Sequence, residues 1–586
     1  MSLLSEHRRR NIFKVASVYL ISGWLLLQIF DVVSPYLQLP MIFGTVVIIT
    51  LSIGFPIICI LAFIFEISPD GIKRIKKIHA SSSALVKKTG VVELVGGGVE
   101  EAISAELSAG RMVEPDSSKS KLSQDIKKLA VLPFSNIVDH PDTNFLGFAL
   151  ADQIIGSIAY SKNVLVRPSS SIRPYQNTLL DIQEIGSKLN VHFVLAGSYL
   201  KEAETVRLNV ELVELCSEEM IWRESIEIKY QNVFELQDIV SQKIAYNLKV
   251  HFSKEERKRM KPHAPQNSIV YDFYLRAVAI PFTVDGNIKA IELLDNSVKL
   301  DPLYAPAYFE LGCRYMQMAQ IGHDTESAHN NSEKSFLKAL SLKEDFLAAL
   351  ANLGMLYTDA GKHYEAHLLL IKALKINPND AWLHFSLSYH YRYIGFLNRS
   401  EKEMEIALEI DPNNPQFRSS IVTSMYLGKY KAILESFDLA IDSPFTLNYL
   451  GEVAFRDGNK RLALEYFEKV LDIDNEIGEY HFAASFIAYM NGDIQTAISL
   501  NFDRESENPV DGEIWYEIAR LYGLFDCTED CRRALEKAIT MGYVSYPSID
   551  GDAFLESVKK EPKIQKLIEV AKSKHEDLNN KLITSY

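Results

Sequence analysis

Hydrophobic positions follow three different patterns along this chain of 586 residues. Near the start they form two nearly continuous apolar runs, residues 12–34 and 41–67. Between residues 126 and 255 they occur as short runs and as alternating apolar and polar positions. From residue 269 onward they recur every three or four positions, which is the spacing of helices that bury one face. The pattern predicts a multidomain chain with a two-helix transmembrane hairpin, a small α/β domain and an all-α repeat solenoid.

Each of the two apolar runs is long enough to cross a bilayer as a helix, which takes about 20 residues. Lys and Arg precede the first run and follow the second, and the connecting loop carries no charge. The positive-inside rule then puts both ends in the cytoplasm. We expect residues 1–79 to form this membrane hairpin and residues 80–125, rich in Ser, Gly, Ala and Glu, to form a flexible linker.

The next segment alternates predicted strands and helices. Strands are expected at 128–134 and 164–170, and helices at 145–160 and 181–190. Three β-like runs follow between 192 and 230, and the last two alternate as half-exposed antiparallel strands do. A helix that begins near Asn232 closes a domain over residues 126–255.

Asp152, Arg167 and the serines 169–171 lie near the ends of the first predicted strands and helix of this domain. They could form the rim of a ligand site at the carboxyl ends of strands. We favour the plainer interpretation, in which they cap helices and stabilise loops.

Separated motifs carry a resemblance to a known family: RRNIFKVASVYLISGWLLLQ and FEISPDGIKRI, then LAVLPF, IGSKLNVHFVLAGSYL and ELVELCSEEMIWRE. The chain resembles bacterial proteins that join a membrane hairpin, a TolB amino-terminal-like domain and tetratricopeptide repeats. The resemblance implies a two-span protein of the inner membrane with most of its chain in the cytoplasm. It implies no agreed activity. Some relatives carry an adenylate cyclase domain or a DNA-binding winged helix, and neither is found in this sequence.

The last part of the chain repeats with a period of 34 residues. Asp-Pro or Asn-Pro closes a unit at prolines 302, 378, 412 and 509, and small residues recur at fixed places where paired helices approach closely. This is the tetratricopeptide pattern. We expect about eight repeats over residues 269–545, beginning near 271, 305, 347, 381, 413, 444, 478 and 512, and capping helices over 546–586. The fifth repeat is degraded, either as a hinge or through divergence, and we favour divergence.

Stacked repeats of this kind curve, and the first helix of each repeat lines the concave side. Aromatic residues at equivalent positions predict a groove for an extended or helical peptide, with Arg and Asn as hydrogen-bond donors. In the alternative, these rings pack between neighbouring repeats. The candidate groove residues are Phe309, Asn352, Trp382, Phe385, Tyr389, Arg392, Tyr393, Tyr449, Phe455, Arg456, Phe482, Phe486, Tyr489, Tyr516 and Arg520.

Composition and motifs exclude several classes of function. Acidic residues outnumber basic residues by 76 to 62, so a nucleic-acid partner is disfavoured. Five cysteines in the whole chain exclude a disulfide scaffold, and the pair Cys527 and Cys531 is expected to be structural. Zinc-ligand spacing, a phosphate-binding loop and nucleophile motifs are missing from the sequence. We therefore expect no catalytic residue, no cofactor, no metal and no enzyme activity.

The sequence thus predicts a non-enzymatic scaffold, anchored in the inner membrane, that recruits a protein partner through the repeat groove. The alternative function is a signalling regulator whose α/β domain binds a small ligand and modulates partner binding. A third, an envelope-facing protein, requires inverted membrane topology. The identity of the partner and the formation of homo-oligomers stay open.

Overall fold

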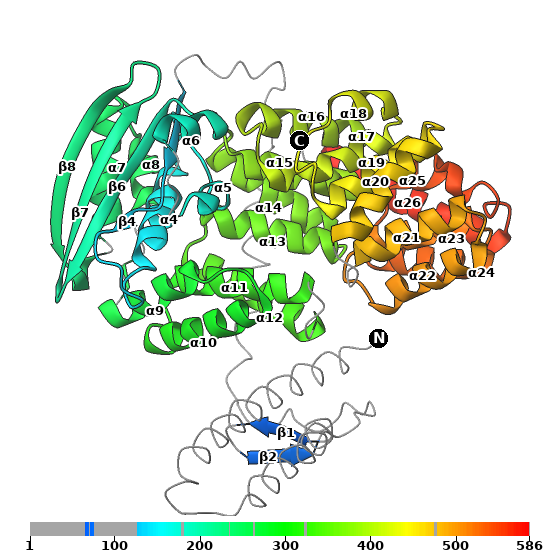
Figure 1. Ribbon diagram of the computed structural model, residues 1–586, viewed down its shortest axis with the longest axis horizontal. Coiled ribbons are helices and arrows are strands. Elements are labelled where there is room, and N and C mark those ends of the chain that lie inside the picture. The colour runs from blue at the N-terminus through cyan, green and yellow to red at the C-terminus, as the bar shows by residue number, and fades with distance from the viewer. Residues whose placement is uncertain are drawn as a thin grey trace, which may run out of the picture. The chain divides into compact units, whose positions relative to one another are not determined.

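The computed structural model describes residues 65–68, 71–74 and 126–584, with gaps at 177–180, 234, 262–263, 266, 321–324 and 474–477 (Figure 1). The chain divides into two compact units, Met1–Leu94 and Val95–Tyr586. The α/β domain and the repeats both belong to the second unit. The predicted linker at 80–125 lies outside the described residues.

The structure corrects the prediction of a transmembrane hairpin. Among the described residues, no helix is long and apolar enough to cross a membrane. The end of the second predicted span, residues 41–67, contributes to strand β1, Phe65–Ser68, which pairs antiparallel with β2, Gly71–Arg74. The sequence at the junction of these strands, Ser-Pro-Asp-Gly from residue 68 to 71, favours a tight turn over a helix end. The rest of the span at 41–67 and all of the span at 12–34 lie outside the described residues, and a two-span inner-membrane protein is not supported.

The α/β domain is built on a mixed sheet of strand order β5-β3-β6-β7-β8, with β4 paired to β6. β3 runs parallel to β5 and β6, whereas β6, β7 and β8 form an antiparallel meander. The strands are β3 Lys127–Val131, β4 Ser135–Asn136, β5 Val164–Val166, β6 Phe193–Glu202, β7 Thr205–Glu214 and β8 Glu219–Lys229. The helices are α4 Leu146–Ile158, α5 Ser169–Ile172, α6 Ile182–Lys188, α7 Glu235–Asn247 and α8 Lys254–Met260.

Burial in this domain follows the side-chain periods of its elements. In β7, Val206, Leu208, Val210 and Leu212 are buried, and the residues between them are exposed or half-buried, because successive side chains point to opposite faces of a sheet. Helix α4 is buried along most of its length. It packs against β3, β5 and α7, and also against the first helix of the repeats. The domain and the repeats therefore share one continuous apolar core.

Eight consecutive helical pairs form the described part of the repeat array, and they follow one another from green to red in Figure 1. The fifth pair is short and follows an irregular turn, which agrees with the degraded sequence there. The pairs are α9 Ser268–Ala279 with α10 Val284–Leu300, α11 Ala305–Gln320 with α12 Thr325–Leu342, α13 Leu347–Asp359 with α14 His363–Ile376, α15 Ala381–Tyr393 with α16 Leu397–Ile410, α17 Ser420–Tyr426 with α18 Tyr430–Ser436, α19 Pro444–Arg456 with α20 Lys460–Ile473, α21 Gly478–Met490 with α22 Ile494–Ser506, and α23 Gly512–Leu524 with α24 Thr528–Thr540.

The last elements of the chain contact the middle of the array. They are α25 Tyr546–Asp550, the short 3₁₀ turn Ala553–Leu555 and α26 Pro562–Thr584. Helix α26 packs on α14 as well as on α24 and α25. The Val544 N–H donates to the Tyr393 carbonyl at 3.0 Å, and His575 Nδ1 donates to the Ile394 carbonyl at 2.6 Å. The third and fourth repeats are therefore held against the carboxyl-terminal end of the chain.

A glycine at this contact gives a first testable prediction. Gly542 has φ +100°, and a Cβ there would lie 2.5 Å from the Gly361 Cα. Gly542→Ala therefore combines backbone strain with a backbone clash, and we expect a loss of about 2–3 kcal/mol in the free energy of unfolding of the array. Gly458 is the matched control, because its φ is +85° but a Cβ there meets nothing within 4 Å. Gly458→Ala should cost only about 1 kcal/mol in urea denaturation, and equal losses in both variants would contradict the proposed contact.

Candidate functional site

The α/β domain lies against one edge of the repeat array, and the contacts repeat with the period of the sequence. In three successive repeats, the first residue after the second helix is polar or charged. These residues are spaced 34 apart, and they are Lys343, Asn377 and Asp411. Asp345, Asn379 and Asn413 lie two residues further on in each case. We call these six residues the docking edge.

Residues of the docking edge bind the carboxyl-terminal ends of three helices of the α/β side. Lys343 Nζ donates to the Arg259 carbonyl in the last turn of α8 at 3.1 Å. Asn377 Nδ2 donates to the Ala159 carbonyl at the end of α4 at 2.7 Å. Asn413 Nδ2 donates to the carbonyl of Lys188, the last residue of α6, at 2.9 Å. The last carbonyls of a helix have no partner within the helix and carry partial negative charge, so donors at these ends stabilise the docked arrangement.

Arg167 is the central residue of this contact, and its side chain is fully buried. Its Nη1 lies 3.0 Å from Asp411 Oδ1, and its other nitrogens donate to the Leu189 and Asn190 carbonyls at 2.6 and 2.8 Å. Burial raises the pKa of Asp411, and the Arg167 guanidinium opposes that increase. One side chain thus joins the end of α6 to the fourth repeat.

Replacing Arg167 tests how firmly the domain is docked. Arg167→Lys keeps the charge near Asp411 but loses the planar fork that also reaches the α6 carbonyls, and charged hydrogen bonds contribute about 1.5–3 kcal/mol each. We expect docking to weaken by about 2 kcal/mol, which corresponds to roughly 30-fold faster deuterium exchange at the end of α6. Arg207→Lys, at an exposed pair with Glu227, should leave the exchange there unchanged. Unchanged exchange in Arg167→Lys would contradict the assigned role.

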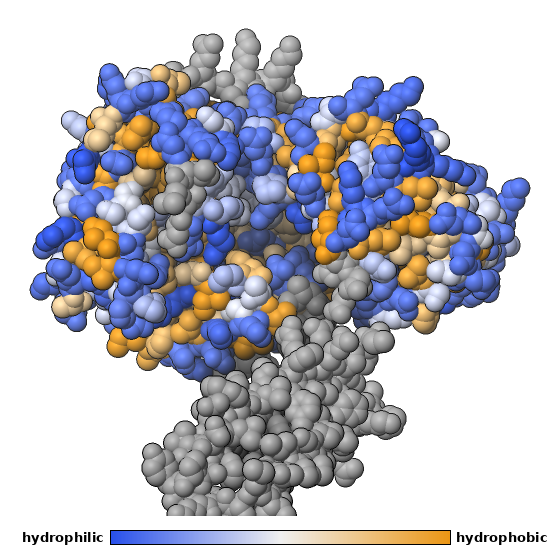
Figure 2. All heavy atoms as spheres, viewed as in Figure 1, coloured by the Kyte–Doolittle hydropathy of each residue, from blue (hydrophilic) through white to orange (hydrophobic). Residues whose placement is uncertain are grey.

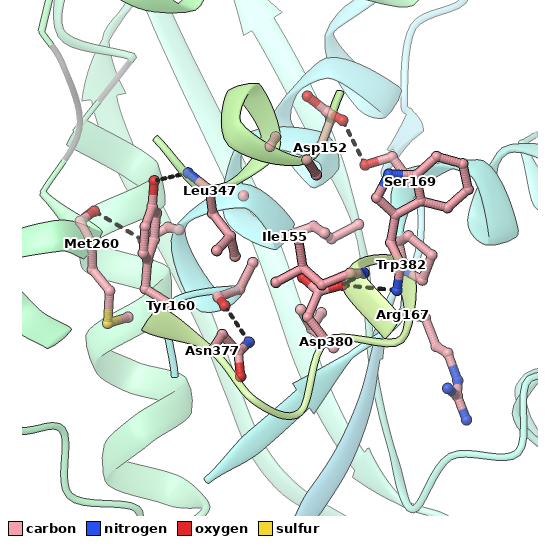
Figure 3. A pocket seen from close by; sticks show the side chains of 18 of the residues that line it. Asp152, Ile155, Tyr160, Arg167, Ser169, Met260, Leu347, Asn377, Asp380 and Trp382 are labelled. Atoms are coloured by element: carbon pink, nitrogen blue, oxygen red, sulfur yellow. Dashed lines mark hydrogen bonds between the residues drawn. The ribbon is translucent and has the colours of Figure 1, made fainter. Parts of the chain in front are cut away.

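A cavity of about 350 Å³ lies between the α/β domain and the second to fourth repeats. The α/β domain contributes Asp152, Ile155 and Ser169 to its lining, and the repeats contribute Phe309 and Trp382 (Figure 3). Ser169 Oγ donates to Asp152 Oδ1 at 2.5 Å. Burial raises the pKa of Asp152 to about 6. The cavity thus combines aromatic surface with one partly desolvated carboxyl group.

The candidate groove residues of the second to fourth repeats have contacts within the chain. Phe309 packs on Phe336 and Phe346, and Trp382 packs on Phe385, which stacks on Phe417. The Asn352 side chain is within hydrogen-bond distance of Cys313 Sγ at 3.7 Å. Phe309 and Trp382 both border the cavity, so part of the predicted stripe faces the chain's own α/β domain.

The remaining candidates of the fourth repeat contact the third and the eighth repeats. Tyr389 donates to Asp359 at 2.8 Å. Arg392 binds Glu513 through two of its nitrogens, and Tyr393 donates to Asp511. Arg392 and Glu513 are 121 residues apart in the chain, and both side chains are buried. This contact joins distant repeats.

The candidates of the later repeats belong to a second buried network. Glu452 pairs with both Arg456 and Arg520, and Arg456 also pairs with Asp552 at 2.9 Å. Tyr449 donates to Glu517, and Tyr516 donates to Asp552 at 2.9 Å. The other members are aromatic: Phe482 and Phe486 are buried, and Phe455 and Tyr489 pack beside them. Peptide binding by these fifteen residues stays a prediction.

Sequence reasoning missed the docking edge, although its signal was present. The Asn-Pro and Asp-Pro pairs identify Asn377 and Asp411 as repeat ends, but the pattern assigns them only to helix termination. Identical spacing of polar residues at several repeat ends could have indicated a shared partner. Within the described ranges, no group of three or more His, Cys, Asp or Glu residues could hold a metal ion.

Two models of known protein families match separate parts of the chain. A family model described as the second domain of HilA/YgeH-like transcriptional regulators matches residues 124–243, and a tetratricopeptide repeat model matches residues 346–377. The repeat array is therefore of the tetratricopeptide class. The resemblance of the α/β domain to the TolB amino-terminal-like domain stays a prediction.

Curated relatives match only in part. The chain is 24% identical over 185 residues to "Putative adenylate cyclase 3" of Rhizobium meliloti (strain 1021), which covers 31% of this chain and 32% of that protein. It is 23% identical over 193 residues to "Anaphase-promoting complex subunit 3" of Schizosaccharomyces pombe (strain 972 / ATCC 24843), covering 32% of this chain and 28% of that protein. The chain thus spans about a third of these relatives' length. A solved structure of Pseudomonas aeruginosa pilF overlaps at 16% identity and a TM-score of 0.30, over 36% of this chain and 95% of that chain.

Proposed function

We propose that this chain is a non-enzymatic scaffold that binds a protein partner through its tetratricopeptide array. Tetratricopeptide repeats are typically non-enzymatic and bind other proteins. The docking edge holds the array against the α/β domain, so a bound partner is kept close to that domain. Such co-localisation raises the effective concentration of the partner without any new chemistry.

An exposed apolar face on the first helical pair is the observation that carries this proposal. Six large apolar side chains on α9, on α10 and in the adjoining turns are between 40% and 59% exposed. Terminal repeats of a solenoid usually have a polar outer face, because nothing stacks on them. Figure 2 shows hydrophobic residues exposed over the α9–α11 region. The six residues are Ile269, Phe282, Val284, Ile288, Leu300 and Leu303.

The chemistry of this face favours an amphipathic helix or an apolar loop of the partner. Val284 and Ile288 lie one turn apart on α10, the spacing that anchors one side of a bound helix. Candidate groove residues are largely engaged within the chain, which favours the α9–α10 face over the interior of the array. Exposed apolar side chains that are gathered at one place, as Phe282, Val284 and Ile288 are along the start of α10, mark interaction sites on soluble proteins.

Capture of partners by the tagged full chain tests the proposal. The variant Val284→Asp/Ile288→Glu should lose a co-purifying protein that the unaltered chain retains, and binding of that purified protein should weaken at least about tenfold. The matched control is Ile473→Glu/Phe502→Asp, which places charges at equally exposed apolar positions on other repeats. Circular dichroism checks that both variants stay helical.

Two different negative results would contradict two different claims, the binding face and the scaffold function. Equal recovery of the partner by the α10 variant would contradict binding at the α9–α10 face. If no protein co-purified with the unaltered chain, the scaffold function itself would be contradicted.

A further inference from the structure

One wall of the cavity between the α/β domain and the repeats consists of aromatic side chains. Phe309, Phe346 and Trp382 come from three successive repeats and line the same space. Phe309 and Phe346 have ring centroids 5.0 Å apart, so these two form a continuous aromatic surface. Aromatic faces attract apolar rings and also cations, because the ring face carries negative charge density.

The opposite side presents a carboxyl group whose charge is not balanced by an ion pair. Asp152 accepts hydrogen bonds from Ser169 and, at 3.1 Å, from Gln153. The charge of Arg173 also acts on Asp152, but among the described residues no Lys, Arg or His forms an ion pair with it. Figure 3 shows the Asp152 and Ser169 side chains pointing toward one another. Desolvation raises the pKa of Asp152 to about 6. A cation placed next to a desolvated carboxyl group favours its ionised form.

Several other charged groups around the cavity are already engaged, and the exposed Lys261 also lines it. Arg167 is paired with Asp411, Arg259 with Asp345, and the Lys343 ammonium with a backbone carbonyl. Asp380 accepts from the backbone N–H groups of Trp382 and Leu383 at the start of α15. A cationic ligand would meet Asp152, which forms no ion pair among the described residues, whereas an anionic ligand would have to use Lys261 or the already engaged Lys343.

We propose that this cavity binds a small organic cation, an amine that carries an aromatic ring, with its ammonium group on Asp152 and its ring against Trp382 and Phe309. A volume of about 350 Å³ suits a molecule of that kind, since small-molecule sites begin at about 300 Å³. The ligand would contact both the α/β domain and the repeats, so it would stabilise their docked arrangement. This inference does not depend on the scaffold function.

Isothermal titration calorimetry of the full chain with tryptamine tests the site near neutral pH. We expect one tryptamine per chain and a raised melting temperature. Asp152→Asn keeps the hydrogen-bonding shape but removes the charge, and it should weaken tryptamine binding at least about tenfold. The matched control is Asp285→Asn, an exposed carboxylate on α10, which should bind tryptamine as the unaltered chain does.

A comparison of ligands on the unaltered chain keeps the test independent of variant folding. Tryptamine should bind at least about tenfold more tightly than 3-ethylindole and than indole-3-propionate, which share its ring but lack the ammonium group. Equal or tighter binding of indole-3-propionate would overturn the proposal, because it would assign the polar contact to Lys343 or Lys261. Absence of tryptamine binding, or undiminished binding by Asp152→Asn, would overturn it as well.

Discussion

Arg392→Met should destabilise the repeat array by about 3–5 kcal/mol, because it leaves Glu513 buried without its cation. The two side chains are 1% and 8% exposed, and the guanidinium binds both carboxylate oxygens at 2.9 Å. Burial raises the pKa of Glu513, and the nearby carboxylates of Asp511 and Glu517 raise it further, so their negative charge adds to the penalty. Urea denaturation followed by circular dichroism measures the loss.

Two further variants show whether the buried pair is the cause. Arg392→Met/Glu513→Leu removes both charges and should recover most of the lost stability, since apolar replacement of a whole buried pair is often neutral. Arg532→Met breaks exposed pairs with Glu529 and Glu536 on α24 and should cost less than about 1 kcal/mol. If Arg392→Met cost no more than Arg532→Met, the contact between the fourth and eighth repeats would be contradicted.

Much of the repeat array could be predicted from the sequence, because each helical pair is specified locally. The 34-residue period and the prolines after Asn377 and Asp411 indicate where each pair ends, and helix ends are observed at the residues before them. The tetratricopeptide class is confirmed by the matching family model at residues 346–377. Local patterns suffice here since each repeat contacts mainly its neighbours.

Contacts between distant repeats could not be predicted in the same way. Whether Tyr393 or Arg520 lines a groove or is buried depends on how far the array curves, and that is the sum of small rotations over many repeats. Asp511 and Glu452, their partners, lie 118 and 68 residues away in the chain. Apolar residues that recur on one face of a helix identify its buried side, but they do not identify the element that covers that side.

The hairpin prediction was wrong for a related reason. Hydropathy measures only the apolar content of a run, and the second run extends into Phe65–Ser68, which forms a strand with Gly71–Arg74. An apolar run is compatible with a strand as well as with a helix, and flanking turn residues decide between them. Here the Pro-Asp-Gly sequence was the better guide.

Three buried histidines between the third and fourth repeats should make the array sensitive to acid. The ring centroids of His363 and His367 lie 5.8 and 5.9 Å from the ring centroid of His390. His363 Nε2 donates to the Gly542 carbonyl at 2.7 Å, which ties this ring to the end of the array. Burial lowers the pKa values of His363 and His367 to about 4, and burial together with these two neighbours lowers that of His390.

The sign of the effect follows from these depressed pKa values. An unfolded histidine takes up a proton near pH 6.5, whereas the folded His363 and His367 resist it until about pH 4. Their contribution to stability is therefore fully present above pH 6.5 and is lost as the pH falls through about 4. Buried Asp152 and Glu513, whose pKa values are raised to about 6, act in the opposite direction over the same interval. The histidine contribution is thus isolated by comparing variants at two pH values.

Between about pH 7.5 and pH 4.5, the loss of stability should be about 2.5 kcal/mol smaller in His363→Gln than in the unaltered chain, and about 5 kcal/mol smaller in His363→Gln/His367→Gln. Glutamine keeps an Nε2 donor for the Gly542 carbonyl but cannot take up a proton in this range. His140→Gln, in an exposed loop of the α/β domain, is the control and should keep the full acid sensitivity. Parallel pH profiles for all variants would mean that these histidines are solvated in the folded array. Losses of acid sensitivity of this size in the single and double variants would locate that part of it at the junction of the third and fourth repeats with the end of the chain.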